Sequence, residues 1–167
     1  MKTVDIAYIA GIVDGEGYIG IKKTSAHKCQ GRVNNGYHAR IQIRMVDEPA
    51  IKFISETLGG WYYKEKPSVT KGRPLYCFQA SDKSAESVLK TILPFLRVKK
   101  ESAETVLNLR RIQAGSRKHR TKITGYRQFP NKYGTARTVA NMSFSDEYIQ
   151  SVHALYERCK ALNKVGA

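Results

Sequence analysis

Apolar residues near the N-terminus recur every three to four positions, a spacing that predicts an α-helix with one buried face. The residues of this face are Ile6, Ile9, Ala10 and Val13. Thr3 or Asp5 can cap the start of the helix, and Gly15 and Gly17 can end it. Residues 18–23 then alternate between apolar and polar side chains, which predicts a half-buried strand. The expected order is therefore helix, glycine turn, strand.

The same two patterns continue along the chain and predict two hairpins with further helices. Residues 39–45 alternate again after an Asn35-Gly36 turn signal, so they are expected to complete the first hairpin. Asp47 can cap a short helix, and residues 61–66 and 74–80 are expected to form a second hairpin. We therefore predict an α+β fold in the order αββαββα. Helices would cover one face of a four-stranded antiparallel sheet and leave a polar, basic face bare as a DNA-binding saddle.

The C-terminal part has a different composition. From Thr105 to Asn141 there are nine lysine and arginine residues and no acidic residue. Together with glycines and Pro130, this predicts an extended basic arm that becomes ordered mainly on a partner. A last amphipathic helix is expected around residues 149–159. We therefore divide the chain into a core, residues 1–114, and a region 115–167 in which the basic arm is followed by a helix packed on the same domain.

Charge identifies the kind of partner. The 29 lysine and arginine residues outnumber the 14 aspartate and glutamate residues, which gives a formal net charge of +15. An excess of this size in a compact fold predicts a polyanionic partner, and nucleic acid is the leading one. No segment has the length or apolar purity of a transmembrane helix, so no membrane partner is expected. The three cysteines are widely spaced and odd in number, which is typical of reduced thiols in an intracellular protein, and no secretion signal is expected.

The letters GEGYIG, residues 15–20, fit the G-x-G-x-x-G pattern of a dinucleotide-binding loop. Such a loop needs a strand before its first glycine and a helix after its last, because the helix N-terminus holds the pyrophosphate. The predicted order here is the reverse. We therefore expect no small-molecule cofactor.

Two acidic residues, Asp14 and Glu16, lie where the first helix is expected to end. Carboxylates are disfavoured at a helix C-terminus by about 0.3–1 kcal/mol each, because the macrodipole is negative there. A divalent cation would compensate them, and carboxylate, backbone carbonyl and water oxygens are the ligands that Mg²⁺ prefers. Two solvated acids on a loop are the alternative interpretation of these residues alone.

The nine residues Ile9 to Gly17, IAGIVDGEG, closely resemble the signature of the LAGLIDADG homing endonucleases. The resemblance also includes the predicted order of elements and the segment LPFLRVKK, residues 93–100, and it covers about Ile6 to Ile112. It implies a site-specific double-strand DNA endonuclease that hydrolyses phosphodiester bonds with a divalent metal at a long pseudo-palindromic site. Because the chain contains one copy of the motif, a homodimer is implied.

The resemblance also assigns roles to residues of the motif. Glu16 would bind the catalytic metal and Gly15 would lend it a backbone carbonyl. Mg²⁺ is the expected ion, and Mn²⁺ or Ca²⁺ can substitute in binding. Ala10, Gly11 and Asp14 would lie where the motif helices of the two subunits pack together.

Outside the motif, Lys99 corresponds to the family's lysine near the scissile phosphate. Met45 lies where related enzymes often place a polar side chain near the metal water, so the water-positioning role is unassigned. The outward-facing residues of the hairpins are expected to contact DNA: Lys22, Thr24, Arg40, Gln42, Arg44, Lys64, Lys66, Arg73 and Gln79. In the arm, Arg117, Lys118 and Arg120 are expected to contact phosphates.

The alternative function is a non-cleaving nucleic-acid binder, such as an intron RNA splicing cofactor (maturase) or a DNA-binding regulator. Intron RNA would then be a partner. The presence of both Glu16 and Lys99 favours the nuclease, because a pure binder requires neither residue.

Overall fold

The structure is a computed structural model that describes residues 2–26, 34–66, 73–129 and 137–165. Its first part contains α1 (Thr3–Glu16), β1 (Gly17–Thr24), β2 (Gly36–Met45), α2 (Glu48–Leu58), β3 (Trp61–Glu65), β4 (Leu75–Ser81) and α3 (Asp82–Ile92). The second part contains η2 (Leu93–Phe95), α4 (Lys100–Ala114), η3 (Ser116–His119), β5 (Arg120–Phe129), β6 (Arg137–Phe144) and α5 (Asp146–Val165). The predicted α+β fold and its order αββαββα are confirmed, and α4 follows that unit.

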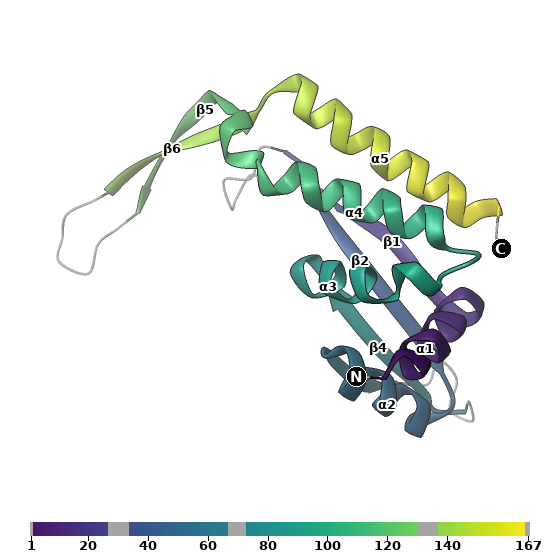
Figure 1. Ribbon diagram of the computed structural model, residues 1–167. Helices are drawn as coiled ribbons and strands as arrows, with labels where there is room; N and C mark the ends of the chain where they lie inside the picture. Colours follow the sequence, from purple (N-terminus) through teal and green to yellow (C-terminus); the bar gives the residue numbers. More distant parts are fainter. Residues whose placement is uncertain (1, 27–33, 67–72, 130–136, 166–167) are drawn as a thin grey trace.

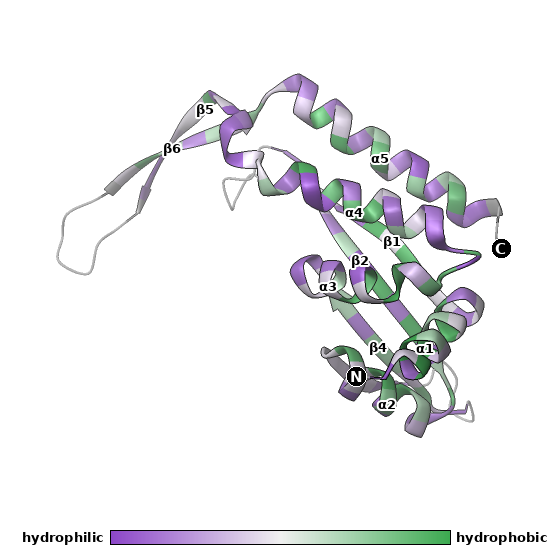
Figure 2. Cartoon of the chain, viewed as in Figure 1, coloured by the Kyte–Doolittle hydropathy of each residue, from purple (hydrophilic) through white to green (hydrophobic). Residues whose placement is uncertain are grey.

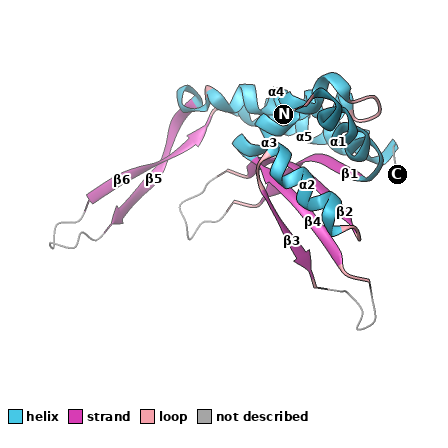
Figure 3. Cartoon of the chain, turned by 60° about the horizontal axis from the view of Figure 1, so that its bottom comes forward, coloured by secondary structure: helices cyan, strands magenta, loops and turns pink. Residues whose placement is uncertain are grey.

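The first four strands form one antiparallel sheet in the order β1-β2-β4-β3. The register pairs Ile19 with Ile41 and Ile43 with Phe78, and directly paired residues share a face of the sheet. All four side chains are fully buried. Figures 1 and 3 show the described helices on this side of the sheet, and none of them lies on the other face. Figure 2 shows the matching alternation of hydrophobic and hydrophilic residues along β2.

Helix α1 packs on the covered face through Ile9, Ala10 and Val13, none of which is exposed. Fully burying an isoleucine side chain stabilises a fold by about 1.5–3 kcal/mol. The opposite side of the helix is also apolar but exposed, since Val4 and Tyr8 are 76% and 56% exposed. Helix α1 therefore carries apolar residues on two sides, and its own chain covers only one of them.

Helix α5 packs against α4 and β1. Val152 and Cys159 are buried in the shared core, and the Asn163 side chain donates a hydrogen bond of 3.0 Å to the backbone oxygen of Ile19. The C-terminal helix is therefore part of the same packed body as the sheet. In the described part of the chain, no helix has both the length and the apolar composition needed to cross a bilayer.

The expected extended arm is instead a β-hairpin, so this prediction is wrong. Strands β5 and β6 pair with each other in a separate two-stranded sheet, which we call the ribbon, and Figure 1 shows it projecting away from the body. The register contains irregularities near Lys122 and Gly125. The ribbon covers no core, so its sequence lacks the apolar alternation by which the other strands are recognised.

Candidate active site

Asp14, in the last turn of α1, binds the segment that leads into α4. Its carboxylate accepts hydrogen bonds from the backbone nitrogens of Arg97, at 2.7 Å, and Lys99, at 2.9 Å. Charge-assisted hydrogen bonds of this kind are among the stronger polar contacts in proteins. Asp14 therefore fixes the start of α4 to the end of α1.

The side chain of Lys99 returns to the same helix end. Its ammonium group donates to the backbone oxygens of Val13, at 3.1 Å, and Asp14, at 2.6 Å. The last carbonyls of a helix have no partner within the helix, and a cation there is favoured by the macrodipole. The backbone of Lys99 binds the Asp14 carboxylate, while its side chain binds the carbonyls of Val13 and Asp14. The predicted catalytic lysine is thus held next to the residues Gly15 and Glu16.

Glu16, the last residue of α1, is exposed and makes no hydrogen bond or ion pair with any residue that the structure describes. It lines a recess of about 520 Å³ on the bare face of the sheet, together with Tyr18, Lys22, Arg40, Gln42 and Arg44. The recess therefore contains one carboxylate and three cationic side chains. No group of three or more histidine, cysteine or acidic residues that could hold a metal occurs among the described residues. At this recess, the chain thus supplies one carboxylate, Glu16, that is free to bind an ion.

Small residues line the exposed side of α1. Val4, Tyr8, Gly11 and Gly15 are spaced as on one helical face, and a Cβ added at either glycine would have no heavy atom within 4 Å. Ala10 lies on the other side and is fully buried in its own chain. The prediction that Ala10 faces a partner is therefore wrong, because the core of its own chain covers it. The Asp14 carboxylate binds backbone of its own chain, and its place at a subunit interface stays a prediction. Gly11 does lie on the exposed side.

The bare face of the sheet carries most of the predicted contact residues of the first hairpin. Lys22 on β1 and Arg40, Gln42 and Arg44 on β2 lie there, as does Gln79 on β4. Two of them bind each other, since Arg40 donates to Gln79 at 2.6 Å, and Arg44 donates to Glu65 of β3 at 2.9 Å. The Nε of Arg40 is buried and has no hydrogen-bond partner among the described residues.

Other predicted contacts are less accessible or lie at the sheet margins. Gln42 is only 8% exposed and donates to the Cys77 sulfur at 3.0 Å. The Thr24 hydroxyl donates to the backbone oxygen of Gly36 at 3.4 Å, at the end of β1 away from Glu16. Lys66 and Arg73 are exposed just outside β3 and β4.

Lys64 does not lie on the bare face, so its assignment as a base-contacting residue is wrong. It pairs with Tyr76, and its ammonium group lies 6.0 Å from the centre of that ring, on the side of the sheet where Tyr62 packs against the core. Trp61 and Tyr63 face the other way, with ring centres 5.1 Å apart, and Trp61 is 60% exposed. The second hairpin thus presents aromatic rings where lysines were expected.

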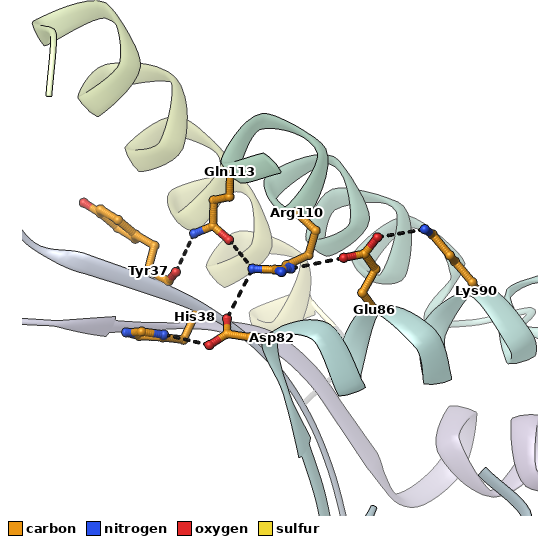
Figure 4. A network of polar contacts seen from close by, with 7 residues as sticks. All are labelled: Tyr37, His38, Asp82, Glu86, Lys90, Arg110 and Gln113. Carbon is orange, nitrogen blue, oxygen red and sulfur yellow. Dashed lines mark hydrogen bonds and ion pairs between the residues drawn. The ribbon is translucent and has the colours of Figure 1, made fainter. Parts of the chain in front are cut away.

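A second polar cluster lies near the opposite end of β2 (Figure 4). The Asp82 carboxylate binds His38 at 3.1 Å and Arg110 at 3.6 Å, and Arg110 also binds Glu86 at 3.3 Å. Gln113 donates to the backbone oxygen of Tyr37 at 2.6 Å. A cavity of about 600 Å³ adjoins this cluster but does not include Glu16 or Lys99. Because these side chains largely satisfy one another, we assign the cluster a structural role in holding α3 and α4 to the sheet.

The described helices lie on one face of a four-stranded antiparallel sheet and leave a basic face bare, an α+β arrangement that solved homing endonucleases share. I-CvuI, a homing endonuclease in complex with its target, superposes with a TM-score of 0.65 at 17% identity, over 95% of this chain and 82% of that one. The archaeal intron-encoded homing endonuclease I-Vdi141I, complexed with DNA, gives 0.65 at 14% identity, over 95% and 84%.

The I-SmaMI LAGLIDADG homing endonuclease, bound to cleaved DNA, gives a TM-score of 0.62 at 16% identity, over 90% of this chain and 42% of that one. No family model and no curated protein matches the sequence. At these identities the likeness establishes the fold. The chain has the LAGLIDADG homing endonuclease fold, and the resemblance predicted from the motif is confirmed at that level.

Proposed function

We propose that this protein is a site-specific, divalent-metal-dependent endonuclease that cleaves double-stranded DNA as a homodimer. The observation that carries the proposal is the meeting of an unpartnered carboxylate, Glu16, and an ammonium group, Lys99, at one helix end beside a bare basic sheet. The fold shared with DNA-complexed homing endonucleases supports it.

The residues at this helix end fit a divalent cation. The Glu16 carboxylate and the Gly15 carbonyl are oxygen donors of the kind that Mg²⁺ prefers, and Mg²⁺ is commonly held by one or two carboxylates together with substrate phosphates. Such an ion, when bound, makes a nucleophilic water more acidic and stabilises negative charge on the reacting phosphate.

Lys99 contributes a positioned positive charge. An ammonium group has three N–H donors, and Val13 and Asp14 accept from it at their backbone oxygens. A donor therefore remains for a phosphate oxygen. Because the backbone of Lys99 is itself fixed by Asp14, the charge is oriented before DNA arrives.

The exposed side of α1 supports a homodimer. Gly11 and Gly15 leave the backbone open for close approach by a second helix, and Val4 and Tyr8 would be removed from water. A twofold axis along this face would bring the two Glu16 carboxylates together. Each copy would then contribute one metal-binding carboxylate, as cleavage of both strands requires.

The test compares Glu16→Gln with Glu56→Gln, a matched change on an exposed carboxylate of α2. The probe is a duplex selected by the wild-type protein from a randomised pool. We expect Glu16→Gln to reduce Mg²⁺-dependent cleavage by roughly 10²-fold or more while duplex binding is retained, and Glu56→Gln to behave as wild type. Cleavage by Glu16→Gln equal to that of Glu56→Gln would refute the catalytic assignment.

The alternative function has its own outcome in this assay. A wild-type protein that binds duplex or intron RNA without cleaving DNA in Mg²⁺, Mn²⁺ or Ca²⁺ would be a splicing cofactor or a DNA-binding regulator. Either function places the protein with nucleic acid, and we extend the proposal to an intracellular site of action.

A further inference from the structure

The ribbon, β5 and β6, is basic and carries exposed apolar side chains. Arg120, Lys122 and Arg127 lie on it, and no acidic residue occurs from Thr105 to Ser145. Ile123, Tyr126 and Met142 are 52%, 69% and 37% exposed. By register, Ile123 pairs with Met142 and Tyr126 with Ala140, so these apolar side chains share one face.

The base of the ribbon is fixed to the body by stacked rings. The Tyr148 ring of α5 lies 5.2 Å from His119 and 4.6 Å from Phe144, between the centres of the rings. The guanidinium of Arg120 lies 5.2 Å from the centre of the Phe144 ring, and the Ser145 nitrogen donates to the His119 oxygen at 2.8 Å. Both strands are thus held where they leave the helices.

A second anchor comes from the connection between β1 and β2. The Asn34 side-chain oxygen accepts from the Ser143 hydroxyl at 3.1 Å and from the Phe144 nitrogen at 3.2 Å. The end of α4, from which the ribbon emerges, is in turn held by Arg110 and Gln113 (Figure 4). The direction of the ribbon is therefore set by the body of the protein.

A recess of about 370 Å³ joins the ribbon to the bare face of the sheet. Its lining combines the end of the first hairpin, including Asn34 and His38, with Arg120, Arg127 and Asn141 of the ribbon, and contains no acidic residue. His38 pairs with Lys22 on the bare face. In Figure 3 the ribbon and the sheet extend from the same side of the helical layer. The basic surface of the sheet thus continues onto the ribbon.

We infer that the ribbon is a second DNA-binding element, which binds the duplex immediately outside the segment covered by the four-stranded sheet. The inference rests on the proposed function. A two-stranded ribbon fits the major groove, where cations meet phosphates and exposed apolar side chains can contact thymine methyl groups. Strand β5 has 10 residues, which at about 3.3 Å each spans roughly 30 Å, or about nine base pairs of duplex. Each ribbon would lengthen the contacted site by up to about one helical turn.

The test uses two full-length variants and two duplexes. The ribbon variant combines Arg120→Gln, Lys122→Gln and Arg127→Gln. The control variant removes the same number of charges from the helices α2, α3 and α4, by Lys52→Gln, Lys83→Gln and Arg111→Gln. The long duplex is selected by the wild-type protein from a randomised pool, and the short duplex lacks about one helical turn at each end. Hydroxyl-radical footprints and dissociation constants at 50 and 200 mM salt are the measurements.

We expect the wild-type footprint to cover the ends of the long duplex and the ribbon variant to leave them unprotected. Three phosphate contacts make affinity fall about 40-fold more steeply between the two salt concentrations for each ribbon that is engaged, so the two ribbons of a dimer should give a difference on the order of 10³-fold between the long and the short duplex. The control should match the wild type, and the ribbon variant should treat both duplexes alike. Tyr126→Ser, at an exposed position where folding is not at risk, should weaken binding to the long duplex only.

The outcomes separate the two proposals. A wild-type protein that selects no duplex contradicts the proposed function and the ribbon inference together. A wild-type protein that cleaves its duplex, but with footprints and salt slopes that the ribbon variant and Tyr126→Ser leave unchanged, overturns the ribbon inference alone. Stronger effects in the control than in the ribbon variant would overturn it as well.

Discussion

Replacing Asp14 by asparagine should destabilise the protein markedly, because this carboxylate joins the end of α1 to the start of α4. It accepts two backbone hydrogen bonds, from Arg97 at 2.7 Å and Lys99 at 2.9 Å. Asparagine offers one oxygen and one amide group, so it can satisfy only one of these nitrogens and turns a donor toward the other. Hydrogen bonds to charged groups contribute about 1.5–3 kcal/mol each. The expected loss is therefore about 2–3 kcal/mol, with a fall in Tm of roughly 4–12 °C for a chain of this size.

The assay is urea unfolding at two protein concentrations, with Asp5→Asn as the matched control. Asp5 lies in the first turn of the same helix and makes no hydrogen bond through its side chain to a described residue. Its replacement should cost at most about 0.3–1 kcal/mol through the helix dipole. The difference between the variants should persist at both concentrations, because the Asp14 contacts lie within one chain.

Two results would contradict this account of Asp14. If Asp14→Asn loses no more stability than Asp5→Asn, the two backbone contacts contribute nothing measurable. If the loss appears only when the protein is dilute, Asp14 acts through an interface between subunits, since oligomer stability depends on concentration.

Three further predictions concern other regions. Gly11→Leu should leave the folded monomer intact but shift sedimentation from dimer to monomer, because space is open at this position in one chain and a second helix would fill it; an unchanged dimer would place the interface elsewhere. Trp61→Ser should weaken duplex binding several-fold while Lys64→Ser does not, since only Trp61 faces the bare side; the reverse ranking would contradict the register. A hydrogen bond from Lys90 lowers the pKa of the Glu86 carboxyl. The ionised Glu86 therefore stabilises the fold above about pH 4.5, and this contribution is lost as the pH falls through the lowered pKa. The Tm of the wild type should therefore drop more between pH 6 and pH 3 than the Tm of Glu86→Gln. Equal drops would show that ionised Glu86 does not stabilise the fold.

The sequence predicted those parts of the fold in which burial imposes a period. Ile41 and Ile43 alternate because one face of β2 is buried, and Ile9 and Val13 recur because one side of α1 is buried. The run Trp61, Tyr62, Tyr63 has no such contrast, so its register could not be fixed from the letters and Lys64 was placed on the wrong face.

The candidate site was predictable in its residue types but not in its contacts. The family resemblance assigns Glu16 and Lys99, but it also places Ala10 between subunits. The apolar period of the helix places Ala10 on the buried face, and the structure agrees with the period. The partners of Asp14 are backbone groups more than eighty residues away along the chain. Neither periodicity nor composition carries information about such a pairing, since any residue type can supply a backbone nitrogen.

The distribution of charge between the two sides of the molecule argues further for a nucleic-acid-binding sheet. Ion pairs such as Lys90 with Glu86 and Arg158 with Glu101 lie on helices, where acidic residues are common. Among the residues of the six strands, Glu65 is the single acidic one, and it binds Arg44. The strands of the sheet and the ribbon carry nine lysine and arginine residues against this one acid, a net charge of +8 out of the total of +15, whereas the residues of the five α-helices sum to -3. Mutual repulsion there disfavours the free protein, and a polyanion laid across both elements would remove it, which is why we expect the sheet and the ribbon to bind one continuous duplex.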